Sequence, residues 1–516
     1  MVLQRVEIKN PVGVNKSLAS ADLPPNVWSN VLNVSFKNGK ASKAAGYSSI
    51  FSPVPSDILH LAPSIESGIL YWYEASYDKI YRTDGTTHLD VSRLVGGAYG
   101  ATDDKGWTNC DLNTLVVMNN SADKPQCKFF GTDNFVDLPN WPATATCEVM
   151  RSYKNYLVAL NINIAGTDYP TTVKWSSPAD PGQAPGTWDE TDATNDAGEN
   201  SLADTAGAIV DGRKLRDSFI IYKEDAVYSM SYTGGVFVFA FKQLFDDVGT
   251  LSKGCVAEFD GKHFVVGQGD VYVHNGVQKS SVISGKMREY LFSNIKADAY
   301  KRTFVVPDYS NTEMWVCFCS SDNNDNLECD KALVWNWLDE TWSLRQLPDI
   351  RYATFGIVDP QLPDDWNSAV GAWDTDALPW GENNYNPSKL KVIMTSSTND
   401  KIYLVGNTTV FDDVIFTSTL ERDGLSINDD RGMKFVSSVT PHITGEGAVQ
   451  LYVGSQYIQD GPVTWKGPYQ YNIGTQYKVD CRVTGRYIAI KFVTESVSNW
   501  SLNGYTLEFT PLAGRR

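Results

Sequence analysis

The chain has 516 residues, of which 42% are hydrophobic and 20% charged, a composition typical of folded globular proteins. Its formal net charge of −17 argues against electrostatic attachment to nucleic acid or to an anionic membrane, because phosphate binding needs clustered Lys and Arg. The chain is longer than one ordinary hydrophobic core supports, so we expect a large repeat-built domain with a smaller one, or several separate domains.

The first 45 residues predict an N-terminal arm rather than a core element. Pro11, Pro24 and Pro25 interrupt regular structure, and only a short strand over 27–36 and a tight turn over 37–40 follow. The N-terminus shows no basic segment followed by an apolar one, so we expect no signal peptide. The longest apolar run, 236–241, is too short to span a bilayer. We therefore expect that the protein does not insert into a membrane and that it is synthesised in a cytoplasm.

Between residues 46 and 414 one pattern recurs seven times: an apolar strand, a polar turn and a second strand that carries an aromatic residue. The seven copies pair the segments 68–73 with 79–85, 113–118 with 126–131, 155–161 with 171–176, 218–222 with 226–231, 262–266 with 271–276, 314–319 with 333–337, and 390–395 with 400–406. Four-stranded propeller blades repeat about every 40 to 50 residues, and radial closure removes the long unpaired edges of an open sheet. The sequence therefore predicts an all-β protein with a β-propeller of about six to eight blades over 46–414.

Two segments inside this region break the pattern. Residues 284–295 place Met287, Tyr290, Leu291 and Ile295 on one face at helical spacing, which predicts a short helix. Residues 359–387, rich in Asp, Trp and Pro, show no periodicity and predict a long surface excursion.

The pattern of apolar segments and turns changes after residue 415. Apolar or alternating segments at 435–443, 448–454, 487–493 and 505–509 are separated by Gly or Asn turns. About a hundred residues of this pattern is the size of a β-sandwich, which we predict for 415–516.

No motif in the chain predicts a catalytic, cofactor or metal site, and we expect no enzymatic activity. The five histidines, 60, 88, 263, 274 and 442, are dispersed, and no hydrolase, phosphate-loop or dinucleotide glycine pattern is present. Acidic loops at 189–199 and 322–330 contain calcium-type oxygen donors but lack the order of a calcium-binding loop, which favours solvated loops. Cys317, Cys319 and Cys329 allow a three-cysteine metal site, although buried reduced thiols are the reading we prefer.

A glycosidase propeller is the enzymatic alternative. Its Asp-box hairpin has Ser, Asp, Gly and Trp at fixed spacing, and the nearest stretch, Ser177 to Gly182 with Trp188, has the wrong spacing from Ser to Asp and occurs once. Trp175 and Trp188 offer rings that could stack on a sugar, but core packing explains them equally well.

Three places in the chain resemble the propeller-bearing tail hub or nozzle proteins of short-tailed bacteriophages, also called head completion or packaged-DNA stabilisation proteins. The opening places the segment 28–36 before a Gly turn and Lys43-Ala-Ala-Gly46, the central run extends from Trp175 through Asp211-Gly212 to Asn275-Gly276, and the end contains the segments 482–490, 499–505 and 514–516.

The resemblance implies a structural virion protein, six copies of which form a ring below the portal and adaptor proteins. It implies that the ring extends the DNA channel, contacts tail fibres or spikes, retains packaged DNA and passes it during ejection without sequence-specific binding. Ringed acidic subunits would repel phosphates, so DNA would slide through the lumen. The alternative is a tail-associated glycan-binding or depolymerase propeller.

Overall fold

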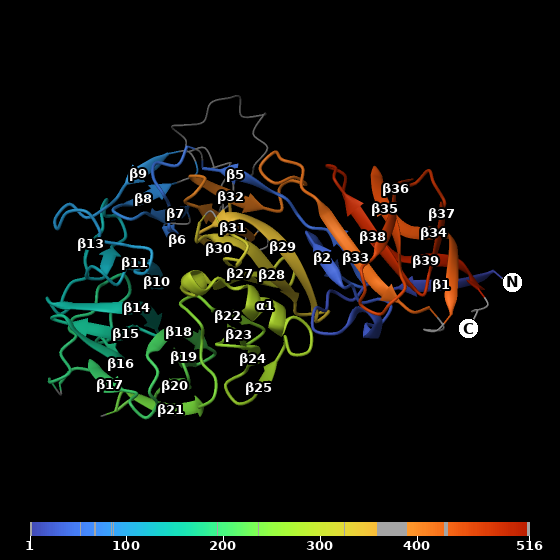
Figure 1. Cartoon of the computed structure of the whole chain (residues 1–516). Helices are drawn as coiled ribbons and strands as arrows, with labels where there is room; N and C mark the ends of the chain where they lie inside the picture. The colour runs from blue at the N-terminus through green and yellow to red at the C-terminus, as the bar shows by residue number, and fades with distance from the viewer. Residues whose placement is uncertain are drawn as a thin grey trace, which may run out of the picture.

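Strands dominate the computed structural model of the protein (Figure 1). The structure describes residues 3–51, 53–66, 69–83, 85, 87–192, 194–235, 237–324, 326–358, 390–427 and 432–512. The excursion predicted over 359–387 and the segment 514–516 lie outside these residues. Of the helices in the described part of the chain, none has the length and apolar character needed to cross a membrane.

Seven four-stranded antiparallel sheets follow one another around a ring, which fills the left part of Figure 1. The first three contain β6 (His60–Glu66), β7 (Ile69–Ala75), β8 (Ile80–Thr83) and β9 (His88–Asp90); β10 (Thr108–Leu112), β11 (Leu115–Asn119), β12 (Gln126–Lys128) and β13 (Val136–Asp137); and β14 (Ala145–Tyr153), β15 (Tyr156–Ile164), β16 (Thr167–Trp175) and β17 (Gly198–Ser201). The next two contain β18 (Ile209–Leu215), β19 (Ser218–Lys223), β20 (Val227–Tyr232) and β21 (Phe239–Phe245); and β22 (Val256–Phe259), β23 (Lys262–Val266), β24 (Val271–His274) and β25 (Lys279–Ser281). The sixth contains β26 (Phe304–Asp308), β27 (Glu313–Phe318), β28 (Cys329–Asn336) and β29 (Thr341–Ile350), and the seventh β30 (Tyr352–Gly356), β31 (Lys391–Ser396), β32 (Lys401–Val405) and β5 (Tyr47–Ile50).

The ring is a seven-bladed β-propeller, and the predicted fold class is confirmed. Each of the seven predicted strand pairs is the second and third strand of one blade. The first strands of successive blades pack against one another around the centre, including the last against the first. The seventh blade takes its outer strand from the N-terminal part of the chain, since β5 pairs with β32 in a register that sets Tyr47 opposite Val405 and Ile50 opposite Ile402. This strand closes the ring.

The second unit is a sandwich of two antiparallel sheets, on the right of Figure 1. One sheet has the order β3 (Val34–Lys37), β4 (Lys40–Lys43), β39 (Trp500–Leu512), β34 (Met433–Gly445) and β37 (Val479–Gly485), with β1 (Gln4–Lys9) also paired to β39. The other has the order β2 (Asn30–Leu32), β33 (Ser418–Leu425), β38 (Tyr487–Thr494), β35 (Ala448–Gln456) and β36 (Thr464–Asn472).

The segment 1–45 differs from the arm that we expected. It supplies four strands of the sandwich, β1 to β4, and Trp28 between them is only 2% exposed. Prolines 11, 24 and 25 fall between these strands, where they remove no ladder hydrogen bond. The sandwich is therefore assembled from both ends of the chain.

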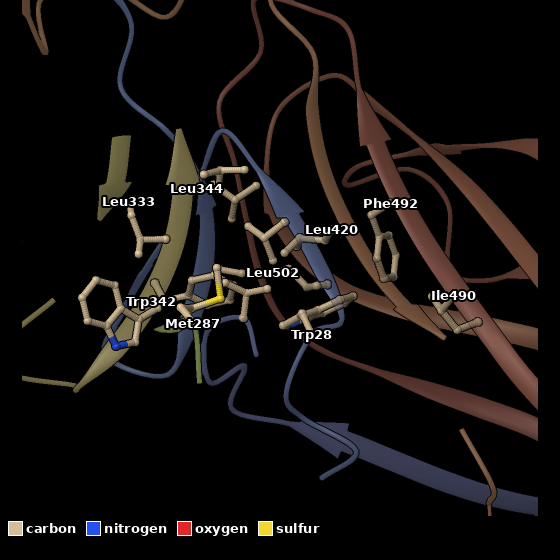
Figure 2. Packing of buried hydrophobic residues seen from close by; sticks show 14 of the residues in the cluster. Trp28, Met287, Leu333, Trp342, Leu344, Leu420, Ile490, Phe492 and Leu502 are labelled. Carbon is tan, nitrogen blue, oxygen red and sulfur yellow. The ribbon is translucent and has the colours of Figure 1, made fainter. Parts of the chain in front are cut away.

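One hydrophobic cluster joins the two units. It combines Leu333, Trp342 and Leu344 of the sixth blade with Trp28 and with Leu420, Phe492 and Leu502 of the sandwich (Figure 2). Trp28 packs against Phe492 and Tyr505 at centroid distances of 6.1 and 6.2 Å. Burial of aromatic rings in one shared cluster resists movement of the sandwich against the propeller.

Helical structure is confined to short pieces in the described part of the chain. The predicted helix over 284–295 is confirmed as α1 (Arg288–Asn294), with Met287 and Leu291 buried in the shared cluster. Two 3₁₀ turns, η1 (Ser20–Asp22) and η2 (Ala297–Arg302), complete the set.

Candidate functional site: a central cavity with an unpaired arginine

The centre of the propeller encloses a cavity of about 1000 Å³. The first strands of all seven blades line it, with polar or charged side chains from most of them. Cavities of this size accommodate small-molecule ligands in other proteins, where a few polar groups fix the orientation of the ligand. This cavity is the candidate site.

An ion pair crosses the cavity wall from the third blade to the fourth. Nη2 of Arg151 on β14 donates to Oδ1 of Asp211 on β18 at 2.8 Å, and Nη1 donates to the backbone oxygen of Asn109 at 3.1 Å. The same Oδ1 accepts from the backbone N–H of Gly212, and Oδ2 accepts from that of Gly254 at 3.1 Å. Burial would raise the pKa of Asp211, but the neighbouring arginines and these donors hold it below its ordinary value.

Arg213, two residues further along β18, has no such partner. Its guanidinium forms no hydrogen bond and no ion pair with any described residue, and its Nε is buried. Burial, followed by repulsion from Arg151, lowers its pKa. Arg213 therefore lies near a carboxylate, Asp211, whose oxygens already accept hydrogen bonds from Arg151 and from two backbone N–H groups.

His60 and Tyr352 lie beside this pair of arginines. Nε2 of His60 is 2.9 Å from Oδ1 of Asn109, and its ring packs on Tyr352 at a centroid distance of 4.1 Å. Burial lowers the pKa of His60 to about 4, and the charges of the two arginines act in the same direction. His60 is therefore neutral near pH 7 and adds no charge to the cavity.

Asp111 on β10 opens onto the same cavity. The side chain is exposed to the cavity, and partial desolvation by the cavity walls raises the pKa of its carboxyl group to about 6, with no cation as a contributing partner. Near pH 7 the carboxyl group is therefore mostly ionised, and it forms no ion pair with Arg213.

An ion cluster spans one end of the cavity. Asp103 pairs with Arg302 at 2.8 Å and with Arg351 at 3.2 Å, and Arg302 continues to Glu328 at 3.3 Å. These residues come from the loop before β10, from η2 and from the sixth and seventh blades. The cluster ties three parts of the ring together, in contrast to Arg213, which has Asp211 nearby but forms no ion pair with a described residue.

A second cavity, of about 380 Å³, lies between the sixth and seventh blades and the sandwich. Nε1 of Trp315 donates to Oε2 of Glu313 at 3.1 Å, and the guanidinium of Arg345 lies 4.4 Å from the centre of the Trp315 ring. Burial, followed by the nearby Asp308 carboxylate, raises the pKa of Glu313 to about 7. Glu313 is thus a buried acid that titrates near neutral pH.

The residues considered as metal or calcium ligands are buried thiols and loop carboxylates, some of which pair with lysines. All eight cysteines are buried and unpaired, as predicted, and burial raises the pKa of Cys319 to about 11. In the acidic loops, Lys174 pairs with Glu190 and Glu199, and Lys331 pairs with Asp322 at 2.8 Å. Within the described ranges, no three His, Cys, Asp or Glu side chains are grouped as metal ligands.

The two tryptophans considered for sugar stacking are both packed in the propeller. Trp175 is 8% exposed and meets Phe239 edge to face at 5.4 Å, and Trp188 is 2% exposed and meets Trp141 at 4.6 Å. Neither ring is free to stack on a sugar, so these residues do not support the glycan alternative.

The sequence did not single out the arginines of the central cavity. Arg151 and Asp211 are 60 residues apart, and only the closure of the ring brings them together. A signal was nevertheless present in the sequence, because Asp211 and Arg213 lie between apolar segments in the region predicted to form the propeller. Charged residues are rarely buried in strands unless they are paired or functional.

Comparison with known proteins gives structural likeness alone. No protein-family model and no curated protein matches the chain. Among solved structures, YCF48 bound to D1 peptide matches at 8% identity over 70% of this chain and 94% of that one, with a TM-score of 0.36. The AfRom2 CNH domain matches at 6% identity over 70% and 98%, with a TM-score of 0.36, and apo AztD from Citrobacter koseri at 12% over 56% and 86%, with 0.32. The strand pairing itself defines the class: a seven-bladed β-propeller joined to a β-sandwich.

Proposed function

We propose that the protein is a structural component of a phage tail, a hub or nozzle that extends the DNA channel below the portal and adaptor. In this proposal six copies form a ring that retains packaged DNA and passes it during ejection. The proposal begins with the resemblance of the opening, central and closing segments of the sequence. The feature of the fold that carries it is the hydrophobic cluster shared by propeller and sandwich.

A tail hub must withstand the pressure of the packaged genome. The shared cluster, centred on Trp28 and Trp342, removes the hinge that a simple linker between two domains would provide. Closure of the seventh blade by β5 adds a second connection, because the chain leaves the sandwich at β4 and enters the propeller directly at β5. Such a body transmits force between neighbours without changing shape.

The sandwich is the better candidate for contacts between subunits. The propeller ring is closed, and its free edges are the outer strands of separate blades. The sandwich ends in β36, a nine-residue strand that pairs on one side only. Tyr457 and Ile458, directly after β35, are 60% and 72% exposed. Exposed apolar side chains beside a sheet edge are typical of association surfaces.

The net charge of −17 suits a channel wall. Six acidic subunits around a lumen concentrate negative potential, so that DNA phosphates are repelled and the duplex slides. The same negative charge disfavours attachment of the channel wall to DNA phosphates.

The test is the mass and shape of the purified protein, alone and mixed with the portal and adaptor complex of its virus, by light scattering and negative-stain imaging. We expect a monomer alone and a sixfold collar on the connector. Failure to bind the connector would overturn the proposal, and a trimer that binds or clears host polysaccharide would favour the glycan alternative.

A pair of variants makes this test specific. Tyr457→Ser with Ile458→Ser should weaken the collar, while Leu338→Ser, which changes a side chain 68% exposed in the turn before β29 on the propeller, should leave it intact. All three positions are exposed, so the fold should be preserved. If both variants form the collar equally well, the assignment of these sandwich residues to the subunit interface is wrong.

A further inference from the structure

We infer that the central cavity of the propeller binds a small oxyanion, a carboxylate or a phosphate, on the guanidinium of Arg213. This inference does not depend on the role in a phage tail. Its starting point is a cation that lines a cavity of about 1000 Å³ and has no partner among the described residues.

The other charged groups beside Arg213, Asp211 and Arg151, already have hydrogen-bond partners. Asp211 accepts from Arg151, Gly212 and Gly254, and it is not within ion-pair distance of Arg213. Nε and both terminal nitrogens of Arg151 donate to Asp211, Gly212 or Asn109. Of the two arginines at the centre, Arg213 is therefore the one with free donors for an anion.

The chemistry of that group selects the ligand. A guanidinium presents its N–H donors in a planar fork that matches the two oxygens of a carboxylate or of a phosphate. Among the groups near Arg213, Arg151 is a further cation, His60 is neutral, and Asp211 is a carboxylate already hydrogen-bonded to Arg151. Tyr309 donates to the backbone oxygen of Glu258 at 3.0 Å. A cation would be repelled by two arginines, and a neutral ligand would leave the charge of Arg213 uncompensated.

The cavity is larger than the anion alone requires. Side chains of Tyr352, Phe355 and Trp107 give it apolar and aromatic surface beside the polar groups. This combination accommodates a small organic acid as well as inorganic phosphate, so the two sources have to be separated by experiment.

The experiment measures thermal unfolding and binding heat of the full chain with citrate, with inorganic phosphate and with chloride at matched ionic strength. We expect citrate or phosphate, but not chloride, to raise the midpoint of unfolding by about 2 to 4 °C at a concentration far above its dissociation constant. A response to citrate alone identifies an organic acid, and a response to phosphate alone identifies a phosphate. No response to either overturns the inference.

Substitutions locate the site. Arg213→Met should abolish the response, and Lys242→Met, which removes an exposed lysine from β21 of the same blade outside the cavity, should retain it. If Arg213→Met does not fold, Arg213→Lys keeps the positive charge but loses the planar fork, and we expect about tenfold weaker binding. An undiminished response in Arg213→Met, or undiminished affinity in Arg213→Lys, would contradict the assignment.

Discussion

Replacing Glu313 by Gln should make the stability of the protein less dependent on pH. Glu313 is 7% exposed and lies between the sixth blade and the sandwich, where burial raises its pKa from an ordinary value of 4.5 to about 7. Below pH 4.5 the group is protonated in the folded and in the unfolded state, so its contribution to stability is fully present. As the pH rises through 7, the folded state must hold a proton that the unfolded state has released, or bury a charge, and this contribution is lost.

The size of the effect follows from the two pKa values. A difference between 4.5 and about 7 corresponds to roughly 3 kcal/mol of unfolding free energy at high pH. Gln keeps an oxygen that accepts from Nε1 of Trp315, and it carries no charge. We therefore expect Glu313→Gln to be more stable than the wild type by about 2 to 3 kcal/mol at pH 8 and nearly equal to it at pH 4.5.

Urea unfolding followed by tryptophan fluorescence at several pH values between 4.5 and 8 measures this difference. Glu289→Gln is the matched control, because Glu289 is exposed on α1 and its substitution should change stability little at any pH. A stability difference between Glu313→Gln and the wild type that is the same at pH 4.5 and pH 8 would refute the reasoning.

Three further substitutions test the packing. Trp28→Ala should lower the unfolding free energy by about 3 to 5 kcal/mol, and calorimetry should show the propeller and sandwich transitions moving apart; a single unchanged transition would contradict the shared cluster. Asp211→Asn leaves Arg151 without its carboxylate and should cost about 3 to 5 kcal/mol in urea unfolding, whereas a loss below about 1 kcal/mol would show that water solvates the arginine. Gly356→Ala would place a Cβ 2.3 Å from the buried ring of Trp72, so we expect a loss of about 1 to 3 kcal/mol; an unchanged melting temperature would show that the ring moves freely.

The sequence was most informative where strands are apolar. The second strands of the blades, such as β11, β19 and β23, consist largely of buried apolar residues followed by polar turns, so local pattern suffices to find them. The first strands were harder to find. The sequence of β18 is Ile-Val-Asp-Gly-Arg-Lys-Leu, and its charged residues are typical of a loop. In the structure β18 is a strand, and Arg213 and Lys214 line the central cavity.

The N-terminal segment shows a second limit of sequence pattern. Its strands are short, and the prolines between them suggested an arm, yet β1 pairs with β39 at the other end of the chain. No local signal specifies a partner hundreds of residues away. The central arginine was missed for the same reason, since its lack of a partner is a property of the assembled ring.

The joining of the two chain ends also constrains how the protein folds during synthesis. The seventh blade can close only after Ile402, the partner of Ile50, has been synthesised. In the same way, β1 can join its sheet only after Phe509, the partner of Gln4, has been synthesised. At translation rates of about 5 to 20 residues per second, Ile50 and Gln4 remain without these partners for roughly 20 to 100 s. Unpaired strands with exposed aromatic residues aggregate readily. The N-terminal strands are therefore the part of the nascent chain that must stay soluble longest before its partners are made.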